Sequence, residues 1–183
     1  MTKLSGSTAQ MHKLKVLSKS IGEIGAVRDD KPARRPLAIL ATPPLTTSGA
    51  RTRGRLQLAT EILGSDVLAI ANLIDVPTKD VLDIASVGRE PAPWREARGD
   101  LASQIAAADT VLLAWGTAEP AGPARDHHRA QVAWVNDVIG SRGIVPWTVG
   151  GMPRHPSRWQ RYTTRRQPGL PFSLALAASL QAG

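Results

Sequence analysis

The segment at positions 150–162, GGMPRHPSRWQRY, combines the residue types best suited to chemistry in this sequence. Its histidine, His155, stands among arginines. Nearby positive charge disfavours an imidazolium, so we expect a neutral ring that donates or accepts a hydrogen bond. A general-base role would need an orienting partner, which the sequence does not show. The alternative is a polar loop that closes the domain. Residues 152–166 hold five arginines and no acid, a pattern typical of polyanion binding: Arg154, Arg158, Arg161, Arg165 and Arg166.

The segment TPPLTTSGARTRGR, residues 42–55, offers a second candidate for anion binding. Hydroxyl side chains lead into a predicted helix, whose first N–H groups are free to meet an anion. Arg51, Arg53 and Arg55 add positive charge at the same place. The segment is neither a Walker loop nor a G-x-G-x-x-G turn, so we predict no nucleotide cofactor. The alternative is a helix-capping loop with exposed arginines.

Asn72 and Trp115 each stand at the end of an apolar run. The amide of Asn72 is able to pair with a base edge, or it holds a neighbouring turn together. Trp115 is either a stacking surface for a base or a core residue. The pair His127–His128 lies on a predicted helix without a third ligand at metal-binding spacing, so the sequence predicts no metal site.

The hydrophobic pattern predicts alternating strands and helices. Apolar runs predict buried strands at residues 37–41, 66–72, 110–116 and 143–151. Helices are predicted over 52–64, 77–88, 93–109 and 124–143, with Thr78 as the N-cap of the second, and a short terminal helix over 170–183. Pro146 cannot donate to a ladder, so we expect the last strand at an edge or bent. The alternation predicts an α/β three-layer sandwich with a mainly parallel four-stranded sheet.

The unusual residues follow the predicted strands. Ligands of open parallel sheets bind outside the carboxyl ends of the strands. The loops there read TPPLTTSGART, NLIDVP, WGTAEPAG and GGMPRHPSRWQRY, whereas the loops at the opposite edge are short and plain. This asymmetry predicts one site at the carboxyl edge.

Amino-acid composition limits the class of binding partner and the cellular compartment that we expect. The net charge of +8 and the pI near 10.8 favour a polyanionic partner. Absence of cysteine excludes disulfides, thiol catalysis and cysteine-ligated zinc. No window is long and apolar enough for a membrane span, and the first residues hold no secretory h-region, so we expect a cytoplasmic protein with no membrane partner. Residues 1–35 predict a basic arm, in part helical or packed as a surface helix, followed by one domain over 36–183.

The loop motifs resemble, in order, an uncharacterised bacterial and phage family typified by NPSxAD…DxTxxR…NL…AWG…GxPxHP. That family is distantly similar to the uracil-DNA glycosylase superfamily. The resemblance covers roughly residues 37–160. It is carried by Thr42-Pro43-Pro44, Thr52 with Arg55, Asn72-Leu73, Ala114-Trp115-Gly116, and Gly151-Met152-Pro153-Arg154-His155-Pro156-Ser157.

The likeness implies a three-layer α/β fold and a pocket for an extruded base. It also implies a catalytic set of His155, Thr42 and Asn72, in which His155 stabilises the departing base anion. Ser157 would contact a phosphate, with Arg154 and Arg158 on the nucleic-acid backbone. Thr42 stands where such enzymes place an Asn or Asp that positions water, and Ala50 replaces the acid of the second motif. Asp75 is the one obvious substitute acid.

Three functions follow from these observations. The first is a glycosylase-like hydrolase that acts on a flipped or modified base in nucleic acid, with DNA favoured over RNA. The second is a DNA-binding protein of the same fold without catalysis. The third is a host-protein-interaction factor from a phage or mobile element, with interface tryptophans: Trp94, Trp134, Trp147 and Trp159.

Overall fold

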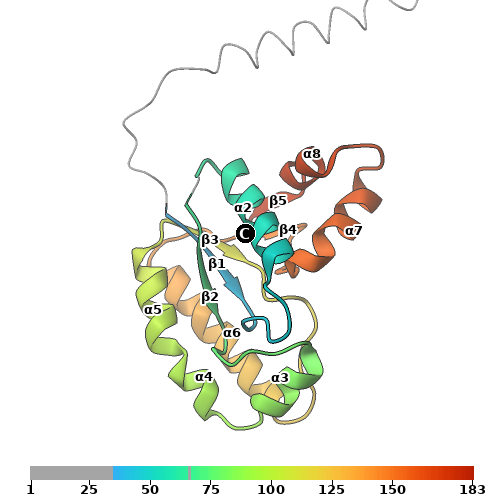
Figure 1. The fold of residues 1–183 in the computed structure, drawn as a ribbon. Coiled ribbons are helices and arrows are strands. Elements are labelled where there is room, and N and C mark those ends of the chain that lie inside the picture. The colour runs from blue at the N-terminus through green and yellow to red at the C-terminus, as the bar shows by residue number, and fades with distance from the viewer. Residues whose placement is uncertain (1–34, 66) are drawn as a thin grey trace, which may run out of the picture. The chain divides into compact units, whose positions relative to one another are not determined.

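The computed structural model describes residues 35–65 and 67–183, and they form an α/β domain around one five-stranded sheet (Figure 1). The strand order is β2-β1-β3-β4-β5. Four strands are mutually parallel and β5 runs antiparallel to β4. The predicted α/β class with a mainly parallel sheet is confirmed. The strands are β1 (Pro36–Leu40), β2 (Ala69–Asn72), β3 (Thr110–Leu113), β4 (Trp147–Val149) and β5 (Leu180–Ala182).

Helices cover both faces of the sheet (Figure 1). On one face lie α3 (Val81–Val87), α4 (Ala92–Glu96), α5 (Arg98–Ala107) and α6 (Ala124–Ser141). On the other lie α2 (Ala50–Ile62), α7 (Pro156–Arg166) and α8 (Phe172–Ala177). Within the described residues, no helix is long and apolar enough to cross a membrane. The predicted arm at 1–35, apart from Arg35, lies outside the described residues.

The two faces have separate cores because successive side chains of a strand point to opposite sides. Leu37 and Ile39 of β1 pack with α3–α6, whereas Ala38 and Leu40 pack with α2, α7 and α8. Trp159 of α7 is fully buried in the second core. This burial fixes the rotation of α7 about its axis, and therefore decides which of its side chains face away from the core.

The fifth strand corrects the predicted strand count and the predicted position of the Pro146 strand. The terminal segment does form the predicted helix, α8, but its last residues then pair with β4. Trp147 of β4 pairs with Ala182, and the N–H of Gly183 donates to the carbonyl of Pro146 at 2.8 Å. Strand β4 is therefore internal. Pro146 lies just before the strand, so its missing N–H costs no ladder bond.

Two helix details also differ from prediction. The segment 93–109 is divided into α4 and α5, which meet at the buried residue Ala97. Helix α3 is capped by Asp80, not Thr78: its carboxylate accepts from the N–H groups of Leu82 and Asp83. Thr78 is instead buried, and its hydroxyl pairs with that of Thr42.

The tryptophans do not form an exposed interface. Trp94 and Trp159 are 3% and 0% exposed and belong to the two cores. Trp134 and Trp147 are half-buried and pack against those cores. The prediction of a tryptophan interface is therefore wrong for Trp94 and Trp159, because amphipathic helices direct both indoles inward.

Candidate functional site

A cleft of about 1070 Å³ opens at the carboxyl ends of the parallel strands. Strand β1 is followed in sequence by β2 on one side of it, and the chain then crosses to β3 on the other. Loops leaving β1 and β3 therefore diverge, which creates a crevice at this point of a doubly wound sheet. The cleft is lined by the segments that follow β1, β2, β3 and β4.

Backbone hydrogen bonds join these loops in pairs. The N–H of Leu73 donates to the carbonyl of Leu40 at 2.9 Å, and that of Thr78 donates to Pro43 at 3.0 Å. On the other side of the crevice, the N–H of Gly116 donates to the carbonyl of Pro153 at 2.6 Å. The walls are thus set by main-chain bonds in addition to side-chain packing.

Most of the predicted site residues line this one cleft. Arg51 is exposed and does not line it, and neither does the substitute acid Asp75. Arg55 lines only a shallower neighbouring groove. The residues brought together are Thr42, Arg53, Asn72, Trp115, Arg154, His155, Ser157, Arg158 and Arg161.

Arg55 joins two helices. Its two terminal nitrogens donate to the carbonyl of Pro156 at 2.9 Å and to Oε1 of Gln160 at 3.0 Å, and its guanidinium lies 5.8 Å from the centre of the Phe172 ring. Burial, followed by the charge of Arg51, lowers the pKa of Arg55. The side chain thereby ties α2 to the start of α7, so its hydrogen-bonding groups are turned away from the cleft.

His155 caps α7 and has a defined tautomer. Its Nδ1 lies 3.2 Å from the N–H of Ser157 and 2.9 Å from the Ser157 hydroxyl. A nitrogen that accepts from a backbone N–H carries no proton, so the neutral ring carries its proton on Nε2. Burial lowers the pKa of His155, and the charges of Arg158 and Arg55 lower it further. His155 therefore offers the cleft a neutral Nε2–H donor.

Thr42 and Asn72 differ in how far their polar atoms are engaged. The Thr42 hydroxyl lies 2.6 Å from that of Thr78. Oδ1 of Asn72 is buried and has no hydrogen-bond partner among the described residues. Trp115 is 8% exposed and belongs to the core, so it forms part of the wall and presents little free face for stacking.

Three buried side-chain atoms in the described part of the chain lack a partner, and all belong to residues that line the cleft. They are Asn72 Oδ1, His128 Nδ1 and Arg154 Nε. Buried polar groups are normally paired, so unpaired ones need an explanation such as ligand contact. His128 is 7% exposed, and its ring packs edge-on against that of Trp94 with the two ring centres 5.8 Å apart. Burial is the main cause of the lowered pKa of His128.

Sequence reasoning missed several of the cleft residues. His128 was considered only as a metal ligand, although its helical position turns it towards the core. On α7, the positions 158, 161, 162, 165 and 166 all line the cleft and repeat at helical spacing. That periodicity was available in the sequence. It adds Tyr162 to the site, and it places Arg165 and Arg166, already noted in the arginine cluster at 152–166, in the lining of the cleft.

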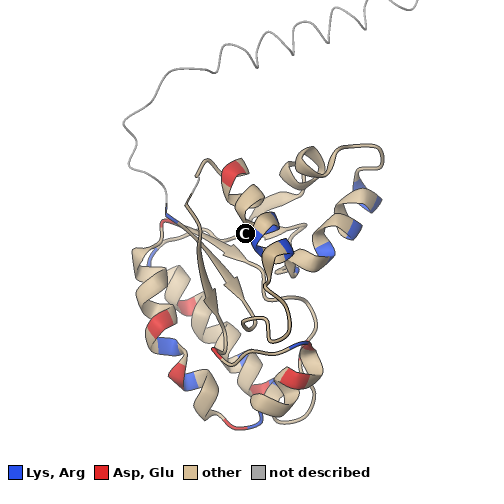
Figure 2. Ribbon diagram, viewed as in Figure 1, with Lys and Arg blue, Asp and Glu red and all other residues tan. Residues whose placement is uncertain are grey.

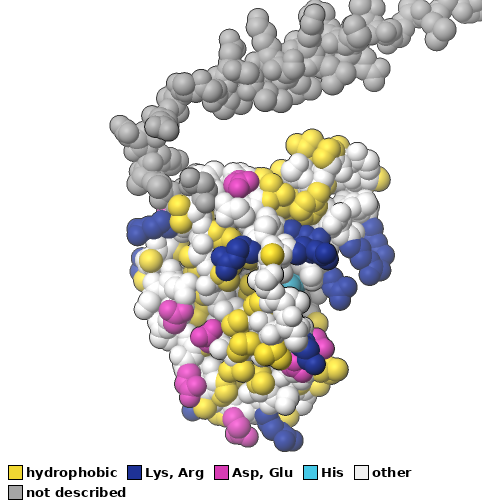
Figure 3. Space-filling view, in the orientation of Figure 1, with side chains coloured by type: hydrophobic (Ala, Val, Ile, Leu, Met, Phe, Trp, Pro, Cys, Tyr) yellow, Lys and Arg dark blue, Asp and Glu magenta, His cyan; other side chains and the backbone are white. Residues whose placement is uncertain are grey.

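The cleft has a strongly positive wall. Figure 2 shows the blue positions of Lys and Arg gathered on α7 and the first turns of α2, with most red acidic positions on other helices. In the space-filling view, dark blue side chains cluster over the α7 side (Figure 3). Asp80 is the only acidic residue among the described residues lining the cleft, and its Oδ1 is engaged by α3.

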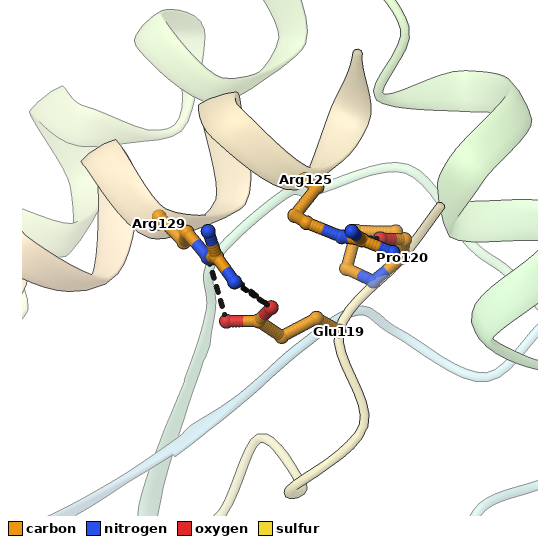
Figure 4. Close-up of polar contacts among 4 residues, drawn as sticks. All are labelled: Glu119, Pro120, Arg125 and Arg129. Atoms are coloured by element: carbon orange, nitrogen blue, oxygen red, sulfur yellow. Dashed lines mark hydrogen bonds and ion pairs between the residues drawn. The ribbon is translucent and has the colours of Figure 1, made fainter. Parts of the chain in front are cut away.

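One ion pair lies next to Ala118 and Pro120, two residues that line the cleft. Glu119, in the loop after β3, accepts from Arg129 of α6 through both carboxylate oxygens, with a shortest distance of 2.7 Å (Figure 4). Arg125 lies alongside and donates to the carbonyl of Pro120, which lines the cleft. The pair of Glu119 with Arg129 is the only ion pair that residues 35–65 and 67–183 form among themselves.

Comparison with known proteins gives no match: no family model, no curated protein and no solved structure is significantly similar to this chain. Within the described ranges, no three histidine or acidic side chains are grouped so as to hold a metal ion. The cleft is mixed in chemical character. It combines neutral donors and acceptors in the interior with arginines on one wall.

Proposed function

We propose that this cleft binds DNA and takes an unstacked nucleotide into its interior. The observation that carries the proposal is the set of unpaired buried atoms on Asn72, His128 and Arg154, all at one cleft. Base edges present donors and acceptors together, which is what an amide, a ring nitrogen and a guanidinium are able to satisfy. The neutral Nε2–H of His155 adds a further donor.

The positive wall supports a phosphate-bearing ligand. Arg154, Arg158 and Arg161 line the cleft beside the exposed hydroxyl residue Ser157. None of the three arginines has an acidic partner among the described residues. Such charges attract phosphates and release condensed counterions, so binding should weaken steeply with salt.

Fluorescence anisotropy with labelled single-stranded and duplex DNA, read across a salt series, tests the binding proposal. The pair Arg158→Gln and Arg161→Gln should reduce the salt slope by about 0.7–0.9 for each lost phosphate contact. The matched control is Arg89→Gln with Arg95→Gln, which removes equal charge from exposed arginines that do not line the cleft. Undetectable or salt-independent binding, or an equal effect of the two pairs, would contradict the proposal. Oligouridylate, used in parallel, distinguishes RNA from DNA.

A second candidate function is hydrolytic release of the bound base, as the glycosylase resemblance implies. The specific observation favouring it is the hydrogen bond from the N–H of Ser157 to Nδ1 of His155, because it leaves the ring proton to Nε2, and an Nε2–H donor is suited to a departing base anion. In such a reaction the bond from C1′ to the base nitrogen breaks, water oxygen bonds to C1′, and the base leaves as an anion that is later protonated. The water would need a base, and Thr42 supplies only a hydroxyl. Binding is therefore the first proposal and catalysis the second.

The catalytic candidate is tested with oligonucleotides that contain uracil or other altered bases. Formation of an abasic product, abolished in His155→Asn, would support it. Asn is a good N-cap, so this variant removes the imidazole and keeps α7 capped. If the parent protein yields no abasic product on any substrate, the protein is a binding protein only.

A further inference from the structure

The side of α7 that lines the cleft is a stripe of four arginines and one tyrosine. Helix neighbours at three- and four-residue spacing lie on one face, about 5–6 Å apart. The stripe comprises Arg158, Arg161, Tyr162, Arg165 and Arg166, all of which line the cleft. The opposite side of the helix is buried through Pro156, Trp159 and Thr163. Core packing therefore holds the arginine face of α7 towards the cleft.

Aromatic contacts order part of this stripe. The guanidinium of Arg154 lies 4.3 Å from the centre of the Tyr162 ring, and that of Arg166 lies 5.7 Å from the same ring. Cation–π contact restrains both side chains before any ligand arrives, which lowers the entropy lost on binding. Tyr162 itself packs against the backbone of Gly150, where an added Cβ would collide with its hydroxyl and ring.

The stripe carries positive charge that no acidic side chain of residues 35–65 and 67–183 neutralises through an ion pair. The single ion pair of the described residues joins Glu119 to Arg129 and includes no residue of α7. Arginines one helical turn apart repel one another, and a polyanion would relieve this repulsion. Because Arg158 and Arg166 are separated by about two turns, roughly 12 Å along the axis, one phosphate is too small to meet them all.

A shallow groove continues the stripe beyond the cleft. It lies between α2 and α7 and is lined by Arg55, Ser157, Gln160, Arg161, Thr164 and Arg165. Three of these residues, Ser157, Arg161 and Arg165, also line the cleft. They form a ridge between the two depressions, so a flexible strand is able to leave the cleft across arginine side chains.

We propose that the ligand is an extended single strand of several nucleotides, whose phosphates follow α7 from Arg158 to Arg165 and Arg166. This inference depends on the proposed DNA-binding function and specifies its substrate class. One nucleotide occupies the cleft, and the phosphates on one side of it contact successive arginines. The stripe faces into a cleft that also contains His155 and Asn72, a position suited to a flexible strand rather than to the side of a rigid duplex.

The test compares thymidine oligonucleotides of increasing length on the full chain: a mononucleotide, a trinucleotide and a hexanucleotide. Affinity should rise from the first to the last, and the salt slope should steepen by about 0.7 for each added phosphate contact. The double variant Arg165→Gln, Arg166→Gln should lower the ratio of hexanucleotide to mononucleotide affinity by about tenfold, since hydrogen bonds to charged groups are the stronger class. The variant Arg89→Gln, Arg95→Gln should leave this ratio within about twofold of the parent.

The possible failures are distinguishable. Equal affinity and equal salt slope for all three lengths would overturn the strand path and leave the cleft proposal standing. Tighter binding of a duplex than of the hexanucleotide would also overturn it, as would an equal loss in the control variant, which would mean that only net charge matters. If no oligonucleotide of any length binds, the proposed function itself fails. Unfolding midpoints of the variants verify that they are folded.

Discussion

The N–H of Gly116 donates a 2.6 Å hydrogen bond to the carbonyl of Pro153, joining the loop after β3 to the loop after β4. A Cβ built on Gly116 would stand 3.7 Å from the Cβ of His155. The close approach of these two loops brings the segment that follows β3, which includes Trp115, beside His155, the cap of α7. One main-chain bond thus links two of the four segments that surround the cleft.

Gly116→Ala should destabilise the protein by about 1–3 kcal/mol, because Gly116 has a φ of +106°, a conformation that side chains disfavour. Space is not the limiting factor, since a Cβ there meets only an ordinary contact. Urea denaturation measures the free energy of unfolding.

Gly54→Ala is the matched control for this substitution. Gly54 is exposed within α2, and an added Cβ meets nothing within 4 Å. The control should stabilise the protein by about 0.5–1 kcal/mol, as expected for a helix interior. If both alanine substitutions change the free energy of unfolding equally, the positive φ of Gly116 does not require a glycine.

Gly150→Ala should couple to Tyr162. At Gly150 the backbone φ is +65°, and an added Cβ would collide with the Tyr162 ring. In a Tyr162→Leu background only the backbone cost remains, so the substitution should cost less there by about 0.5–3 kcal/mol. A double-mutant cycle by chemical denaturation gives this coupling energy, and strict additivity of the two single effects would show that the ring moves aside freely.

Arg55→Gln should lower stability by about 1–3 kcal/mol, because Arg55 makes charged hydrogen bonds to Pro156 and Gln160 that join α2 to α7. Arg51→Gln, a change of the same charge on an exposed neighbour, should stay within about 0.5 kcal/mol of the parent. Thermal or urea unfolding of the two variants makes the comparison. Equal stabilities would mean that Arg55 is as dispensable to the fold as Arg51.

The regular part of the fold was predictable because its hydrophobic residues follow the spacing typical of buried strands and of helices. The apolar runs at 37–41 and 110–116 are long enough to be recognised as buried strands, and both became central strands. Strand β5 was not predictable in this way. Residues 180–182 are too few to show alternation, and they form a strand only because β4 offers them an unpaired edge.

The candidate site was also predictable only in part. Parallel strands must bring their carboxyl ends together, so Asn72, Trp115 and His155 were expected at one edge and are found there. The distinction between Arg53, which lines the cleft, and Arg55, which points towards α7, depends on the partner helix, which the local sequence does not specify. His128 was missed because its place in the cleft depends on how α6 packs against the sheet.

Two histidines, His128, which is buried, and His155, which is half-buried, should make the protein less stable in mild acid. Burial is the largest cause of the lowered pKa of both His128 and His155; for His155, Arg158 and Arg55 act in the same direction. In the unfolded chain a histidine takes up a proton near pH 6.5. Just below that pH the unfolded state binds more protons than the folded state, so folding stability falls as pH decreases. At higher pH both rings are neutral in both states and contribute no pH dependence. Protonation of His155 would also remove the Nδ1 acceptor of the Ser157 N–H, which caps α7.

The free energy of unfolding should therefore decrease as the solution is taken from about pH 7.5 to about pH 5.5. Urea denaturation at the two pH values measures the decrease. His155→Asn, which keeps a capping side chain, and His128→Gln should each remove part of it, and the double variant should remove more than either alone. A double variant whose stability falls as steeply as that of the parent would assign the acid sensitivity to carboxylates and contradict the role given to these two rings.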